Sequence, residues 1–322
     1  MEASQPSFTD VEYGQRRRRP QRQEFLARMD QVIPWAAWIG LIEPHYFNKK
    51  RGLKPVPLVT MLRMYLLQVW FHLSDENVED AINDSHAMRH FLGFGVRQVP
   101  DATTLLHFRH LLETHKLGEA MFDQLGAVFD AKGWIMRGGT VVDATVIAAP
   151  SSTTNATGTR DQEMRQTQKG NQWFFGMKAH IGVDAGAGYV HTVTATAASV
   201  HDLDQAPLLV RADDEVVYAD ASYQGIAKRD DVVADAHLSR VGYRISARKG
   251  KLKTVVGPDR QIEKTKASVR SKVEHPFLVL KRDFGFTKTR YRGMVKNLNR
   301  LHVAFASVNL LMRARAVAIM TG

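Results

Sequence analysis

The sequence predicts a mixed α/β protein in which an all-α N-terminal domain precedes a domain built on a mixed β-sheet flanked by helices. Two observations lead to this prediction. Apolar residues recur at helical spacing through residues 22–131, and after Gly138 and Gly139 the pattern changes to short runs rich in β-branched residues. The 322 residues are 44% hydrophobic, which is enough to form more than one core.

The N-terminal helices are indicated by apolar stripes and by residues typical of helix caps. One stripe repeats at helical spacing and marks a core helix: Leu58, Met61, Leu62, Tyr65, Leu66 and Val69. Ser74 and Asp101 each precede a further helical run and suit N-cap positions. Short helices joined by tight turns are typical of a helix-turn-helix-like DNA-binding module, although helical bundles of any function share this pattern. We therefore expect a flexible basic arm at residues 1–21 and this helical domain at residues 22–133.

The C-terminal region alternates between strands and helices. Short β-branched and apolar runs predict strands at residues 140–147, 174–183, 189–196, 215–221 and 243–247. Helices are expected at residues 201–210 and 270–281, and over a last stripe formed by Leu298, Leu301, Phe305, Val308 and Met312. The polar stretch 150–171 and the basic stretch 248–266 are expected to be loops or insertions. Three antiparallel strands followed by alternating helices and strands is the order of the ribonuclease H-like fold, which we predict for residues 134–322.

The composition excludes several classes of protein. There is no cysteine, so disulfides, thiolate nucleophiles and cysteine-based zinc sites are ruled out. The N-terminus shows no signal-peptide pattern, and the most apolar stretch, residues 58–71, is too short to cross a bilayer. We expect a soluble protein of the cytoplasm that does not bind membranes.

Positive charge is concentrated in one part of the chain. Residues 244–296 contain sixteen Lys/Arg and four Asp/Glu, whereas residues 199–235 contain nine Asp/Glu and three Lys/Arg. A charged run is often just a solvated surface, but a net charge of +11 usually indicates a polyanionic partner, with nucleic acid the first candidate. We therefore expect the basic segment to face DNA.

Three acidic residues stand where a carboxylate needs an explanation. Asp143 lies in the middle of an apolar strand and Asp220 at the end of another, where burial without a positive partner is costly. Glu274 shares one face of a predicted helix with Arg270 and Lys281. Pro276 either kinks this helix or delays its start. Taken singly, each acid also fits a structural role, such as a salt bridge between Glu274 and Arg270.

Separated carboxylates are the ligands that phosphodiester chemistry needs. Two divalent ions about 3.5–4 Å apart activate a water or a 3′-hydroxyl and stabilise the leaving oxygen. Hard ions such as Mg²⁺ prefer carboxylate oxygens, and nearby Lys and Arg side chains hold phosphates. Spacing along the sequence is compatible with such a site but does not establish it.

Several blocks resemble a known family. The stretches 142–145, 218–225 and 270–277, the last followed by Lys281, resemble the three catalytic blocks of bacterial insertion-sequence transposases of the DDE type. The fifth insertion-sequence family is the most similar. The resemblance extends over nearly the whole chain and includes residues 57–63 and 170–184.

This resemblance implies a function and a set of site residues. Asp143, Asp220 and Glu274 would be the catalytic triad that holds two Mg²⁺ ions, with Mn²⁺ as a substitute. Arg270 and Lys281 would form the R-x3-E-x6-K part of the third block and contact the transposon end. The enzyme would bind terminal inverted repeats, hydrolyse a phosphodiester at each end and join the 3′-hydroxyl to target DNA. It would act on double-stranded DNA as a homo-oligomer, with a dimer favoured, in the bacterial cytoplasm at the nucleoid.

One position departs from the family pattern. A Tyr is expected three residues before Arg270, but Ala267 stands there, which puts any tyrosine role in doubt and leaves the metal site intact. Lys178 is a further candidate for a DNA contact. Trp173, His180 and His201 are left without an assigned role: Trp173 would stack on an unpaired base, or be buried or cap a hairpin.

Two rival functions remain compatible with these residues. One is a structure-selective nuclease of the same fold, which would cut DNA without joining it. The other is a DNA-binding regulator without catalysis. The terminal repeat sequence, the target preference and the stoichiometry of the assembly do not follow from the sequence.

Overall fold

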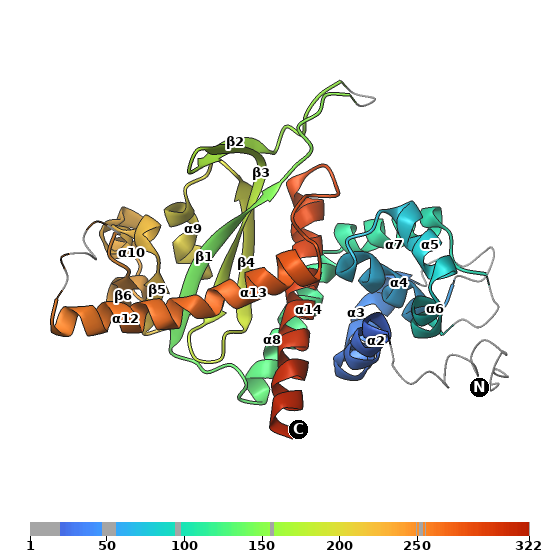
Figure 1. The fold of residues 1–322 in the computed structure, drawn as a ribbon, viewed down its shortest axis with the longest axis horizontal. Helices are drawn as coiled ribbons and strands as arrows, with labels where there is room; N and C mark the ends of the chain where they lie inside the picture. The colour runs from blue at the N-terminus through green and yellow to red at the C-terminus, as the bar shows by residue number, and fades with distance from the viewer. Residues whose placement is uncertain are drawn as a thin grey trace. The chain divides into compact units, whose positions relative to one another are not determined.

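The computed structural model describes residues 20–46, 56–93, 98–154, 158–248, 250, 254 and 256–321. Contacts divide the chain into two compact units: Met1–Ala120 with Leu310–Gly322, and Met121–Asn309. The division runs through the helices α8 (Leu117–Ala131) and α14 (Met294–Thr321), which are labelled in Figure 1. The predicted boundary near residue 133 separates functional domains and stays a prediction. The expected basic arm lies, apart from its last two residues, outside the described residues.

The described part of the first unit is helical, as predicted. Its helices are α2 (Gln21–Val32), α3 (Trp35–Tyr46), α4 (Leu58–Trp70), α5 (Asp75–Asp84), α6 (His86–Leu92) and α7 (Ala102–Thr114). The predicted stripe on α4 is buried, and Met61, Leu62 and Tyr65 are fully inaccessible. Both predicted caps are confirmed. The Ser74 hydroxyl accepts a hydrogen bond from the Asn77 amide at 3.2 Å, and the Asp101 carboxylate accepts one from the Thr104 amide at 2.6 Å.

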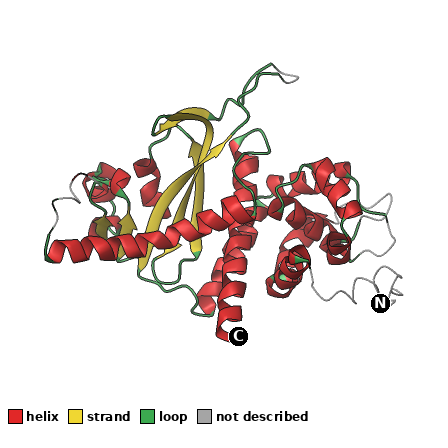
Figure 2. Cartoon of the chain, in the orientation of Figure 1, coloured by secondary structure: helices red, strands yellow, loops and turns green. Residues whose placement is uncertain are grey.

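The second unit contains a six-stranded mixed sheet, seen as the yellow arrows of Figure 2. Its strands are β1 (Gly139–Ala148), β2 (Arg165–Lys169), β3 (Gln172–Asp184), β4 (Val190–Ala197), β5 (Val216–Ala219) and β6 (Gly242–Ile245). Strand β3 pairs antiparallel with β1 on one side and with β2 and β4 on the other. Strands β1, β5 and β6 pair in parallel. Helix α9 (Asp202–Leu209) connects β4 to β5, so the order of elements is the predicted ribonuclease H-like one.

Two predicted loops contain regular structure. The polar stretch 150–171 includes strand β2, which has no apolar alternation and forms because β3 offers it a hydrogen-bonding edge. The basic stretch 248–266 was expected to be a loop, and this is wrong for its second half, where α12 (Pro258–Arg270) begins. Gly257 has a φ of 64° and Pro258 stands in the first turn of the helix. Proline at this position starts a helix, and its lack of an N–H costs nothing there.

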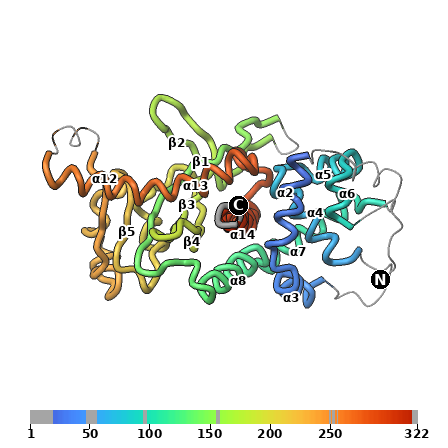
Figure 3. The backbone as a smooth tube through the Cα atoms, turned by 60° about the horizontal axis from the view of Figure 1, so that its bottom comes forward, coloured from blue at the N-terminus to red at the C-terminus, as the bar shows by residue number. Residues whose placement is uncertain are grey.

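The two faces of the sheet are covered by different helices. Helix α9 packs on the face that presents Val142 and Val217. Its approach is so close that a Cβ at Gly182 would lie 2.5 Å from the Leu209 carbonyl oxygen. On the other face, α12 packs against β5, and the 3-10 turn that follows it packs against β1. Figures 1 and 3 both show the α12–α13 segment running across the sheet on this side.

A buried side chain ties β4 to helix α14. The Asn309 amide accepts a hydrogen bond from the Val190 N–H at 2.9 Å and donates one to the Val190 carbonyl at 2.7 Å. Asn309 is only 3% exposed, so it completes the hydrogen bonding of a strand end that water does not reach.

We predict that Asn309→Leu lowers the free energy of unfolding by about 2–4 kcal/mol, because it leaves a buried N–H and a buried carbonyl unpaired. Urea unfolding followed by circular dichroism measures this loss. The exposed Val295 on the same helix provides a control, since Val295→Ala should change stability by less than about 0.5 kcal/mol. An unchanged urea midpoint for Asn309→Leu would show that the clamp contributes nothing.

Candidate active site

Asp143 and Asp220 lie next to each other on neighbouring parallel strands. The register of β1 and β5 pairs Val141 with Tyr218, and both acids follow this pair by two residues. They therefore project from the same face of the sheet, the one crossed by α12. Burial, with a smaller contribution from the negative charge of Asp220 and against a hydrogen bond from the Ala144 amide, raises the pKa of Asp143 to about 6. The two carboxylates are therefore near enough to affect each other's charge.

The Asp220 carboxylate is held at the end of its strand by a cap. Asp220 precedes the short 3-10 helix Ala221–Tyr223, and its Oδ1 atom accepts a hydrogen bond from the Ser222 amide at 2.8 Å. The Ser222 hydroxyl donates to the same oxygen. Two donors on one oxygen fix the orientation of the group, which is what a metal ligand requires.

Glu274 lies on a helical segment that changes its winding three times. Helix α12 ends at Arg270, a 3-10 turn covers Ser271–Val273, α13 covers Glu274–Leu278, and a π-helical turn covers Val279–Asp283. The predicted helix 270–281 is thus helical throughout but not one α-helix. Pro276 is accommodated because the 3-10 turn ends at Val273, which places the proline ring in the first turn of α13.

The Glu274 carboxylate is turned toward an arginine. Its Oε1 atom accepts a hydrogen bond from Arg270 at 3.2 Å, and the side chain is 61% exposed. The positive charge of Arg270 also lowers the pKa of Asp143, so this guanidinium lies near enough to act on Asp143 as well as on Glu274. Within the residues that the structure describes, no three Asp, Glu or His side chains lie close enough together to hold a metal ion. The structure therefore brings Asp143 and Asp220 together and leaves Glu274 paired with Arg270.

The paired acids fit a divalent cation. Two partly buried carboxylates that repel each other would both be stabilised by a hard positive ion between them, and oxygen ligands are the kind that such ions prefer. To become the third ligand, Glu274 would have to leave its hydrogen bond with Arg270 and bind the ion instead.

An acid that sequence reasoning did not single out lies near Asp143, although it begins the helix that covers the opposite face of the sheet. Asp202, the first residue of α9, lies near enough to raise the pKa of Asp143. Its Oδ1 atom is 2.9 Å from the Nζ atom of Lys178, which also donates to the Val200 carbonyl at 2.7 Å. The sequence shows Asp202 only as a helix-start residue, and its place near the other acids depends on strand pairing. These bonds do not favour a DNA contact by Lys178, which stays a prediction.

The two histidines occupy structural positions. His180 is fully buried, with Nε2 at 2.8 Å from the Thr196 hydroxyl. Burial lowers its pKa to about 4, against the opposing effect of Asp202, so the ring is neutral at pH 7. His201 is the N-cap of α9 and accepts a hydrogen bond from the Leu203 amide at 3.2 Å.

Lys281 and Trp173 are the remaining residues of this unit that the sequence singles out. The Lys281 Nζ atom donates to the Val146 carbonyl on β1 at 3.0 Å, and burial together with the nearby Lys169 lowers its pKa. Trp173 is 64% exposed on the β2–β3 hairpin, so it is not buried, and the stacking and hairpin-capping alternatives stay open.

Comparisons with known proteins bear on this arrangement. Residues 134–310 match the family described as "Transposase DDE domain", and residues 14–111 match "Transposase domain (DUF772)". The chain is also similar to a solved structure, the cryo-EM structure of the piggyBac transposase synaptic complex with hairpin DNA. The aligned region covers 94% of this chain and 75% of the piggyBac chain, at 10% sequence identity. Its TM-score of 0.43 does not establish a shared fold.

The described helices include none that is long and apolar enough to cross a membrane.

The first family match extends over more than half of the chain and contains the strands that carry Asp143 and Asp220, together with Glu274. This protein therefore belongs to the DDE-domain transposases, enzymes that bind DNA and use divalent metal ions to cleave it and transfer its strands.

Proposed function

We propose that this transposase serves a bacterial insertion sequence of the fifth insertion-sequence family, and that Asp143, Asp220 and Glu274 together hold two Mg²⁺ ions. The observation that carries the proposal is the parallel register of β1 and β5, which sets Asp143 and Asp220 side by side on one face. Mn²⁺, which accepts the same ligands, would substitute.

Metal ions held by these acids would polarise a water or the 3′-hydroxyl of the DNA and would stabilise the leaving oxygen. The protein supplies position. The cap on Asp220 fixes one carboxylate, and the strand fixes Asp143. Arg270 holds Glu274 away from them until DNA binds. A DNA phosphate competes with Glu274 for the guanidinium, because Arg binds phosphate and carboxylate through the same donors. Glu274 is then free to turn toward the other two acids.

The remaining parts of the chain serve DNA recognition in this proposal. The helical region, residues 22–133, binds the terminal inverted repeats, and residues 134–322 carry out the chemistry. Arg270 and Lys281 contact the transposon end. Lys178, which is held by Asp202, is the weakest of the proposed DNA contacts. Two ends must be cut and joined in one complex, so we propose a dimer on DNA that acts at the nucleoid in the cytoplasm.

We predict that Asp143→Asn and Glu274→Gln each reduce cleavage of a transposon end by on the order of 1000-fold, because each removes a ligand worth several kcal/mol of charge stabilisation. The assay measures cut and joined products from a DNA library of candidate ends with Mg²⁺, and a gel shift checks that binding persists. Glu215→Gln, an exposed acid at the start of β5, is the matched control and should cleave normally. Full cleavage by either variant would remove that residue from the triad, and cutting without joining would indicate a nuclease.

A second prediction concerns pH. Folding raises the pKa of Asp143 from about 3.9 to about 6, because the folded protein favours the protonated carboxyl. This preference stabilises the fold fully below pH 4, and the stabilisation is lost as the pH rises through 6 and Asp143 ionises. Without metal, Asp143→Asn should therefore increase stability by about 1–3 kcal/mol at pH 8 and by much less at pH 4.

Thermal unfolding at both pH values measures this difference. Added Mg²⁺ should raise the melting temperature of the wild type at pH 8 and have little effect on the variant, since only a bound ion stabilises the folded state. Equal stabilisation of both proteins by Mg²⁺ would contradict the assignment of Asp143 as a ligand.

A further inference from the structure

The β2–β3 hairpin presents an aromatic face that the metal site does not explain. In its antiparallel register Gln168 pairs with Trp173 and Gln166 pairs with Phe175, so these four side chains project from the same face. Trp173 is 64% exposed, which is unusual for the largest apolar side chain. Successive side chains on one face of a strand are about 7 Å apart, so two aromatic rings stand in line along β3.

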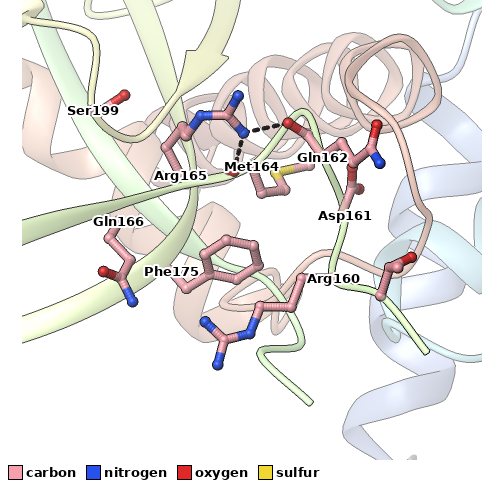
Figure 4. Close-up of a pocket in the computed structure, with 9 residues that line it drawn as sticks. Arg160, Asp161, Gln162, Met164, Arg165, Gln166, Phe175 and Ser199 are labelled. Atoms are coloured by element: carbon pink, nitrogen blue, oxygen red, sulfur yellow. Dashed lines mark hydrogen bonds between the residues drawn. The ribbon is translucent and has the colours of Figure 1, made fainter. Parts of the chain in front are cut away.

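An open groove continues this face. It has a volume of about 680 Å³ and is lined by residues from β2, β3 and the preceding loop, among them Arg160, Arg165, Gln166 and Phe175 (Figure 4). The Arg160 guanidinium lies over the Phe175 ring, 5.6 Å from its centre. Arg165 donates to the Met164 carbonyl at 2.9 Å, which holds its guanidinium at the rim. The groove therefore combines flat π surfaces with fixed positive charge.

Of the two acids in this loop, Asp161 lines the groove, but both carboxylates are bonded to backbone amides. Asp161 accepts a hydrogen bond from the Gly293 amide at 2.7 Å, and Glu163 accepts one from the Met294 amide at the start of α14. Both carboxylates thus satisfy the N-terminal end of a long helix. Residues 164–178 contain three Lys/Arg and no Asp or Glu. The groove therefore has a net positive charge, from Arg160 and Arg165 against Asp161, and it also presents an aromatic ring and glutamine amides.

We propose that this hairpin face, formed by Trp173, Gln166, Gln168 and the Arg160–Phe175 pair, binds unpaired nucleotides of a single DNA strand. Every base has a π face that can stack on an aromatic ring, and the phosphates between bases suit arginine side chains. The glutamine amides offer donors and acceptors to base edges. A duplex cannot use the rings, because its bases are stacked on each other. The site does not involve the three acids, so it stands apart from the proposed triad.

The test compares binding of a fluorescent oligo(dT) strand and of a duplex to the full-length protein by anisotropy. Trp173→Ala should weaken binding of the single strand about 5- to 100-fold and leave duplex binding within about twofold, since stacking contributes about 1–3 kcal/mol per base. Trp173→Phe should restore most of the affinity because it keeps a ring. Arg160→Gln should weaken single-strand binding and reduce its dependence on salt.

Two controls make the outcome decisive. Val233→Ala removes another exposed apolar side chain, 61% exposed, and should bind both DNAs normally. Asp143→Asn should also keep single-strand binding, which separates this site from the catalytic proposal. The proposal is overturned if Trp173→Ala binds the single strand like the wild type, or if it loses both DNAs equally. It is also overturned if Trp173→Ala changes only the sedimentation of the protein, which would make the face an interface between copies.

Discussion

The structure of the catalytic unit depends on one constraint, the parallel pairing of β1 with β5. Parallel strands need a crossover, and α9 provides it by packing closely over Gly182 on one face of the sheet. With α9 on that face, the side chains of Asp143 and Asp220 project from the other one. The same pairing that completes the sheet therefore brings two like charges near each other. Burial, and to a lesser extent the charge of Asp220, raises the pKa of Asp143, so ionisation of Asp143 lowers the stability of the fold.

The third acid belongs to the segment that crosses this face, and its carboxylate is paired with Arg270. A single straight α-helix from Pro258 to Asp283 would place Pro276 in its interior, where the ring would clash with the preceding turn. The chain instead inserts a 3-10 turn before Glu274 and a π-helical turn after Leu278. Such changes of winding are common at functional positions. Through these changes Arg270 and Glu274 remain one helical turn apart, and Val273 stays buried against β1 while Glu274 is exposed.

Elements with strong apolar periodicity could be predicted from the sequence, and elements defined by pairing could not. The core helix α4, the caps at Ser74 and Asp101 and the strands β1, β3 and β5 follow from local pattern. Strand β2 does not, because its polar residues form a strand only when β3 is beside them. The site shows the same division. Asp143 and Asp220 stand out as acids in apolar strands. Asp202 does not, because its contact with Lys178 connects a helix to a strand, and no local sequence pattern predicts a contact between separate elements.

The two regions that we propose to act on DNA, the metal site and the β2–β3 hairpin face, differ in the sign of their charge. At the proposed metal site negative charge is in excess, and Arg270 pairs with only one of the three acids, so bound cations would stabilise the site. On the β2–β3 hairpin the reverse holds, because Asp161 and Glu163 are bonded to the start of α14 and positive charge is left at the groove. Under our proposals, a DNA strand would bring phosphate to the arginines and leave the acids to metal ions, which would satisfy both regions together. The two regions thus differ in the sign of their charge although the whole chain is basic, with a net charge of +11.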